Sequence, residues 1–145
     1  MPLARAAERK EVVRIRSAAR SVISVILHAA GDLEAALATY ELAAADAGRS
    51  EDDHRLALVL GGRGLALAQL GRLPEAFTSL ERARVMLEEM EDTVCLAHTL
   101  NTLATLHERD GNDQAAAEAR QEAKELFRTV GRSRTQTPYR PAPRP

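Results

Sequence analysis

The sequence predicts an all-α protein made of three antiparallel helix-turn-helix hairpins stacked side by side. The segment GRLPEAFTSLERA at residues 71–83 recurs in altered form at 31–43 and 111–123, so the spacing is 40 residues both times. A glycine opens each copy, which places a helix break at the same phase of every unit. The hydrophobic content is 45%, but aromatic residues make up only 3% and Trp is absent. The core must therefore consist of small and aliphatic side chains, which suit close helix packing.

The N-terminal part predicts a lead-in segment, residues 1–16, that is compatible with a helix and continues into a first helix over about residues 11–29. A β-branched cluster lowers the intrinsic propensity of this helix, and we expect the helical context to override it. The helix is apolar on more than one face. A second copy of the chain, the lead-in segment or a domain outside this chain should therefore cover it. The predicted self-association residues, through which a homodimer would form, are Val22, Val25 and Ile26.

Glycines and short polar residues mark where the following helices stop and start. Glycine readily adopts the left-handed conformation that ends a helix, and Ser, Thr, Asp or Asn side chains cap the first turn of the next one. Pro74 fits the first turn of the fourth helix. The expected stops are Gly31, Gly48, Gly71 and Gly111, and the expected caps are Asp32, Ser50 or Asp52, Asp92 or Thr93, and Asn112 or Asp113. The expected helices after the first are about 34–47, 53–70, 74–90, 93–109 and 113–129.

The expected organisation is a lead-in helix at 1–16, repeats at 17–50, 51–90 and 91–129, and a tail at 130–145. The tail is rich in Pro and Arg and has no apolar periodicity, so we predict that it is disordered. It carries four arginines and no acid, which leaves the rest of a chain of net charge −1 with an excess of acidic residues. Nucleic-acid binding is therefore not expected from the body of the protein, and an accessory role for the basic tail is the alternative.

Small residues recur at three positions of each unit. Together with the glycine breakers, they make the units resemble tetratricopeptide repeats in a longer, forty-residue form. The resemblance implies that these residues stand where the two helices of a hairpin touch, at the facing position of the second helix, and where that helix meets the next hairpin. The resemblance covers about residues 17–129, and the alternative is an ordinary helical bundle with accidental glycine spacing. The predicted packing residues are Ser24, Gly64 and Ala104, then Ala36, Ala76 and Ala116, then Ala43, Ala83 and Ala123, with the breakers Gly31, Gly71 and Gly111.

The resemblance implies a right-handed solenoid that acts as a non-enzymatic protein-binding module. The last unit departs from the pattern, with Asp113 and Arg120 at positions that are bulky in the family, as a terminal unit that faces water would. The units are also similar to the C-terminal arrays of bacterial signalling ATPases and transcription regulators. This similarity implies an alternative function as a sensor or oligomerisation arm of such a regulator, self-associating through the N-terminal helix.

The first helix of each hairpin lines the concave face in this family, and its exposed residues form one stripe. Here the stripe is apolar and small in the middle and polar at its C-terminal end, which suits an extended peptide or an amphipathic helix of a partner protein. Gly61 and Gly62 would let a ligand backbone approach closely. Packing of Leu58 and Leu65 on neighbouring hairpins is the alternative. No lysine lies on the stripe, so recognition of a chaperone's C-terminal carboxylate is not expected. The predicted groove residues are Ser21, Val25, His28, Leu58, Gly61, Leu65, His98, Asn101 and Thr105.

No constellation in the sequence predicts catalysis, a cofactor or a metal. The segment GGRG at 61–64 falls inside a helix, outside the strand-to-helix context of a phosphate-binding loop. His54 stands beside Asp52 and Asp53, which we interpret as solvated capping acids rather than ligands. Cys95 is the single cysteine, so an internal disulfide is excluded, and we expect a small buried thiol. The charged start and the absence of a membrane-spanning stretch predict a cytoplasmic protein.

Overall fold

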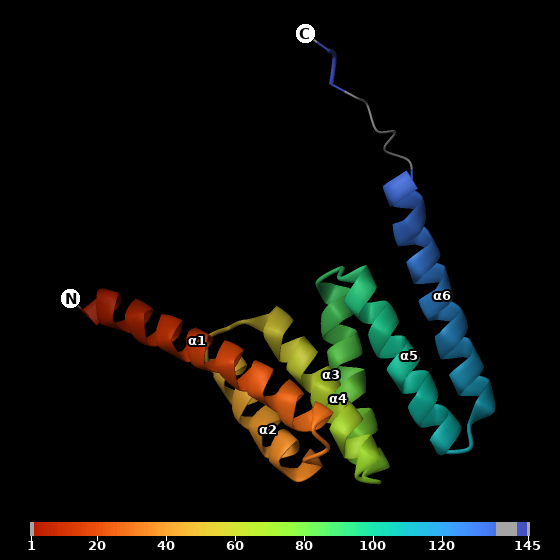
Figure 1. Ribbon diagram of the computed structural model, residues 1–145, viewed down its shortest axis with the longest axis horizontal. Coiled ribbons are helices and arrows are strands. Elements are labelled where there is room, and N and C mark those ends of the chain that lie inside the picture. Colours follow the sequence, from red (N-terminus) through yellow and green to blue (C-terminus); the bar gives the residue numbers. More distant parts are fainter. Residues whose placement is uncertain (1, 136–141, 145) are drawn as a thin grey trace.

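The computed structural model describes residues 2–135 and 142–144, and every regular element within these residues is an α-helix, as the sequence predicts. The helices are α1 (Pro2–Ala29), α2 (Leu33–Arg49), α3 (Asp53–Gln69), α4 (Leu73–Glu89), α5 (Thr93–Arg109) and α6 (Asp113–Thr135). Each helix packs against the next one along the chain, and the first helices of neighbouring hairpins, α1 with α3 and α3 with α5, are also in contact. Figure 1 shows the helices in a row that runs from α1 and α2 to α5 and α6. The predicted stack of hairpins is confirmed.

A new helix begins every 20 residues, although the pattern of residue types recurs only every 40 residues. Each helix from α2 to α5 has 17 residues and is followed by a short turn, so Leu33, Asp53, Leu73, Thr93 and Asp113 start successive helices. The turns inside hairpins place Gly31, Gly71 and Gly111 at φ values of 82°, 79° and 78°. The turns between hairpins place Glu51 and Glu91 at 55° and 56°. Every turn therefore has one left-handed residue, and only alternate turns use glycine.

The expectation that Gly48 ends the second helix is wrong. The helix passes through Gly48 to Arg49, and Ser50 caps its end, with the hydroxyl donating to the Asp46 carbonyl at 3.0 Å. The left-handed residue comes later, at Glu51. A glycine inside a helix lowers the propensity by about 1 kcal/mol relative to Ala, but it does not dictate where the helix ends.

Side-chain oxygens cap the N-termini of four helices, and they show which of the alternative capping residues each helix uses. In each case the oxygen accepts a hydrogen bond from the backbone N–H three residues later. The helix α4 differs, because Arg72 precedes it without a side-chain capping bond and Pro74 occupies its first turn. The four capping residues are Asp32, Asp52, Asp92 and Asn112.

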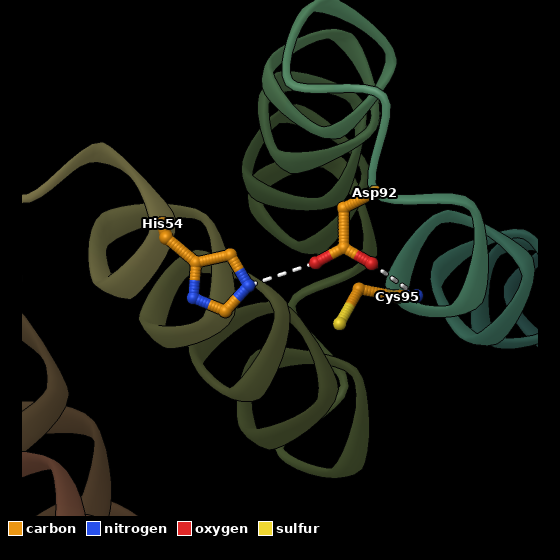
Figure 2. Close-up of side chains that lie close together, drawn as sticks. All are labelled: His54, Asp92 and Cys95. Carbon is orange, nitrogen blue, oxygen red and sulfur yellow. Dashed lines mark hydrogen bonds and ion pairs between the residues drawn. The ribbon is translucent and has the colours of Figure 1, made fainter.

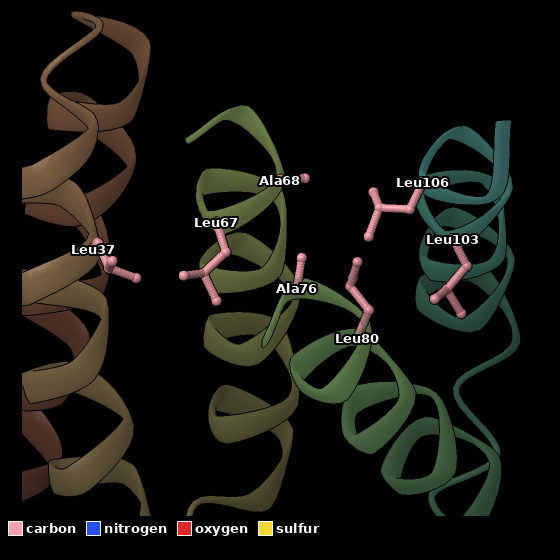
Figure 3. Close-up of a cluster of buried hydrophobic side chains, with 7 residues drawn as sticks. All are labelled: Leu37, Leu67, Ala68, Ala76, Leu80, Leu103 and Leu106. Atoms are coloured by element: carbon pink, nitrogen blue, oxygen red, sulfur yellow. The ribbon is translucent and has the colours of Figure 1, made fainter. Parts of the chain in front are cut away.

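Small residues let the helices pack closely at the positions that the repeat pattern singles out. The reason is explicit at Gly64, where a Cβ atom would come within 2.6 Å of Leu80 Cγ. In Figure 3, Leu37 of α2 points toward Leu67 of α3, and Leu106 of α5 points toward Leu80 of α4. One apolar layer thus continues through four helices, and each hairpin stabilises the next. The buried small residues are Ser24, Gly64, Ala104, Ala36, Ala76, Ala116, Ala43, Ala83 and Ala123.

Both end helices extend beyond the repeat units (Figure 1). The helix α1 begins at Pro2, so the lead-in segment joins the first helix without a break. The helix α6 continues to Thr135, and the expected end near residue 129 is therefore wrong. Gly131 has an ordinary helical φ rather than a left-handed one, so the helix continues through it. Residues 136–141 and 145 of the tail lie outside the described residues, and residues 142–144 are exposed without regular secondary structure.

Candidate functional site

A hollow of about 320 Å³ lies between α1 and α3, on the face formed by the first helices of the hairpins. Four of its aliphatic side chains are strongly exposed: Val22 at 59%, Val25 at 58%, Ile26 at 61% and Leu58 at 47%. Exposed aliphatic side chains gathered in a concavity are typical of a contact surface. The residues that define this first hollow are Ser21, Val22, Val25, Ile26, Tyr40, Arg55, Leu58 and Val59.

A second hollow, of about 270 Å³, lies beside the first between α3 and α5. Its α3 wall includes Leu58, Gly61 and Leu65, and its α5 wall includes Cys95 and His98. Leu58 lines both hollows, so the two adjoin at this residue, on a face that α1, α3 and α5 share. A chain lying across this face would contact α1, α3 and α5 in turn.

The structure brings six of the nine predicted groove residues to these two hollows. They are Ser21, Val25, Leu58, Gly61, Leu65 and His98. The predicted self-association residues Val22, Val25 and Ile26 line the first hollow as well. Val25 belongs to both predictions, and the structure adds Val22 and Ile26 to the side chains that the two predicted surfaces share.

The other three predicted groove residues line neither hollow, and two of them are engaged within the chain. The ring of His28 contacts the Tyr40 hydroxyl at 3.2 Å and the Gln69 side-chain oxygen at 2.5 Å, so it links α1 to α2 and α3. The Thr105 hydroxyl donates to the backbone carbonyl of Asn101 at 3.2 Å. The predicted polar end of the stripe is thus occupied in part by contacts inside the fold.

Gly61 and Gly62 differ in what surrounds them. A Cβ atom on Gly62 would come within 2.7 Å of the Tyr40 ring, whereas one on Gly61 would meet no atom within 4 Å. The missing side chain of Gly62 therefore makes room for Tyr40, and burial raises the pKa of that phenol. Of the two glycines, only Gly61 therefore faces open space.

A buried carboxylate, which the sequence analysis did not find, fixes the position of α1. Asp46 of α2 accepts two hydrogen bonds from Arg16 and one from Arg20, at 2.6–3.0 Å. The hydrogen bonds from Arg16, together with Arg20 and both positive charges, lower the pKa of Asp46 against the effect of burial. Because Arg16 and Arg20 belong to the helix that forms one wall of the first hollow, this cluster positions that wall.

A second unforeseen cluster joins the starts of α3 and α5 (Figure 2). His54 Nε2 lies 2.8 Å from Asp92 Oδ2, and Asp92 Oδ1 accepts the capping hydrogen bond from the Cys95 N–H at 3.1 Å. The capping bond, helped by His54, lowers the pKa of Asp92. The neighbouring Asp52 caps α3 and contacts Arg55, so the acid that partners His54 comes from the next hairpin. Sequence proximity alone could not reveal that pairing.

Cys95 is not an activated thiol. Burial, together with the adjacent Asp92 carboxylate, raises the pKa of Cys95 to about 11. The thiol is half-buried rather than fully buried as expected. A nucleophilic cysteine needs a lowered pKa and a base positioned to take its proton. Here the histidine is directed at the carboxylate (Figure 2), which is not the arrangement of a cysteine protease.

Comparison with known proteins identifies one family. Residues 55–129 match a family model described as "Tetratricopeptide repeat", which covers half of the chain. The match begins in α3 and ends in α6, so it includes both walls of the second hollow. No curated protein and no solved structure matches the chain. Among the described residues, no helix is long and apolar enough to cross a bilayer.

Proposed function

The chain belongs to the tetratricopeptide repeat family, and on this basis we propose that it is a non-enzymatic protein-interaction module that binds a peptide or helix of a partner protein across α1, α3 and α5. The observation that carries the proposal is the pair of largely apolar hollows that adjoin at Leu58. Burying a single aliphatic side chain of this kind contributes roughly 1.5–3 kcal/mol, so a few of them can supply most of the binding energy. The module would work in the cytoplasm.

The polar groups of the first hollow support a ligand recognised mainly by apolar side chains. The Ser21 hydroxyl donates to the Ser17 carbonyl at 2.8 Å, and the Tyr40 hydroxyl contacts His28. Arg55 contacts Asp52 at 3.3 Å. Because these groups already have partners, the remaining contact area is aliphatic, and binding should depend only weakly on salt.

A selection experiment with a matched pair of variants tests this proposal. Peptides selected from a random display library on the full chain should carry spaced apolar residues. Leu58→Glu should weaken their binding by at least about tenfold, because it places a charge in the centre of the apolar surface. Leu42→Glu is the control, since Leu42 is exposed to 50% on α2 and lines neither hollow. Equal affinities of the two variants would contradict the assignment of the groove.

A second candidate function rests on the exposed aliphatic side chains of α1. We propose that this helix mediates self-association, as in a sensor or oligomerisation arm of a bacterial regulator. Val12, Ile15 and Ile23 add to the uncovered surface around Val22 and Ile26. Light scattering over a range of concentrations should detect a dimer that Ile26→Lys converts to a monomer. A wild-type chain that stays monomeric at high concentration would eliminate this candidate. Peptide binding would then remain the proposed role of this surface.

A further inference from the structure

The cluster of His54, Asp92 and Cys95 offers three kinds of metal-binding atom at one place. One ring nitrogen, one carboxylate oxygen and one sulfur all lie within 4.8 Å of one another. His54 comes from the second hairpin and the other two residues from the third, so the cluster spans the contact between hairpins. Its members are half-buried or exposed, which leaves solvent access to the site.

We propose that His54, Asp92 and Cys95 bind one zinc ion that links the second and third hairpins, with a fourth position open to water. Zinc binds imidazole nitrogen, carboxylate oxygen and thiolate sulfur at about 2.0–2.3 Å in tetrahedral geometry. Binding would therefore displace the proton of the Cys95 thiol, which would pass to solvent. Calcium and magnesium prefer sites made of oxygen atoms alone, so a site that contains sulfur and nitrogen favours zinc.

The geometry needs only side-chain adjustments to accept the ion. Tetrahedral coordination at these bond lengths separates the ligand atoms by roughly 3.3–3.6 Å. The His54 and Asp92 atoms, now 2.8 Å apart, would move slightly apart, and the widest separation of up to 4.8 Å would close by about 1 Å. The side chain of His54 is 54% exposed, so its ring has room to make this movement.

The first turn of α5 places Asp92 and Cys95 side by side, and each residue keeps an atom that can bind a metal. Asp92 is the N-cap of α5 and Cys95 stands three residues later, so both side chains lie at the first turn. Asp92 Oδ1 holds the capping bond, and Oδ2, which now contacts His54, would turn to the metal. Zinc would therefore replace one hydrogen bond while the helix cap persists.

The ion would fix how the second and third hairpins meet. Cys95 also lines the second hollow, so the link would hold the α3 and α5 walls of that hollow at a set separation. Zinc would thus stabilise the folded chain, because binding only to the native arrangement adds to its stability. The zinc site does not rest on the proposed peptide binding, and it is tested without a peptide.

Titration of the metal-free full chain with zinc chloride, in competition with a chromophoric chelator, tests the site. We expect one zinc ion per chain and a rise in the unfolding temperature on binding. Cys95→Ser, His54→Gln and Asp92→Asn should each weaken binding at least about tenfold. Asp92→Asn keeps a good capping side chain, so loss of affinity in that variant cannot be ascribed to loss of the helix start. His107→Gln, on the same helix but outside the cluster and both hollows, should bind zinc like the wild type.

Cobalt substitution provides a readout that a merely structural effect would not produce. Cobalt in the site should give a thiolate-to-metal charge-transfer band, which Cys95→Ser should abolish while the helical circular dichroism stays unchanged. The proposal is overturned if the wild type shows no saturable zinc binding, if two chains share one ion, or if His54→Gln and Cys95→Ser bind zinc as tightly as the wild type.

Discussion

The Arg16 guanidinium donates to both carboxylate oxygens of Asp46, from Nε to Oδ2 at 3.0 Å and from an Nη to Oδ1 at 2.7 Å. Arg20 adds a hydrogen bond to Oδ2 at 2.6 Å. The Asp46 side chain is only 1% exposed, whereas those of Arg16 and Arg20 are 43% and 29% exposed. The aspartate is therefore buried while both arginines are partly exposed. Substitution of the acid and substitution of the arginines should then change the stability by different amounts.

Removing the arginines should destabilise the protein more than neutralising the aspartate does. Arg16→Met with Arg20→Met leaves a buried carboxylate without a partner, which costs roughly 3–5 kcal/mol. Asp46→Asn leaves two arginines that can turn to solvent, so its cost should be smaller. Urea unfolding measures both. Arg84→Met is the control, because it removes only surface pairs with Glu81 and Glu88 and should cost less than about 1 kcal/mol. Equal losses of unfolding free energy in Asp46→Asn and in the double arginine variant would contradict this prediction.

Stability should fall in acid partly through Asp46. Its folded-state pKa is lowered, first by the hydrogen bonds from Arg16, below an unfolded value of about 3.9. The stabilisation is therefore complete above about pH 5 and is lost as the pH falls through the unfolded-state pKa toward the folded-state pKa. We expect the difference in unfolding free energy between wild type and Asp46→Asn to shrink from about pH 5 to about pH 3. A constant difference over that range would show that the Asp46 charge adds no stability.

The left-handed conformation of Glu91 predicts a stabilising glycine substitution. At φ 56° a side chain with a Cβ atom is strained, and glycine removes that strain. Glu91→Gly should therefore raise the unfolding free energy by up to about 1 kcal/mol. Glu122→Gly, in the interior of α6, should lower it by roughly 1 kcal/mol because glycine disfavours an ordinary helical position. Thermal unfolding followed by circular dichroism distinguishes the two signs, and a loss of stability in both variants would argue against a strained turn.

The sequence predicts the hairpin stack because its determinants are local and repeated. A breaker such as Gly71 and small residues such as Gly64 and Ala76 recur at fixed spacing, and each has a steric reason visible in one hairpin. The turns between hairpins are harder to predict, since Glu51 and Glu91 carry no signature of a left-handed residue. A glycine alone is equally ambiguous, because Gly48, unlike Gly71, lies within a helix.

The candidate sites depend on contacts that no local pattern encodes. His54 and Asp92 lie far apart in the chain, and they meet only because the second and third hairpins pack side by side. Asp46 lies inside a helix, and only its contacts with α1 distinguish it from a solvated acid. The stripe pattern places Leu58 correctly on the open face, but it could not reveal that His28 contacts Gln69.

Alanine at Gly61 and at Gly62 should separate a ligand-binding role from a packing role. Gly62→Ala should destabilise the protein by roughly 1–3 kcal/mol, because the added methyl group would overlap the Tyr40 ring. Gly61→Ala meets no neighbouring atom and should stabilise α3 by up to about 1 kcal/mol, since alanine is the better helix former. If a partner backbone crosses the second hollow, the same Gly61→Ala variant should bind a selected peptide more weakly despite its higher stability. A Gly61→Ala protein that is more stable and binds the peptide unchanged would place the ligand away from this part of α3.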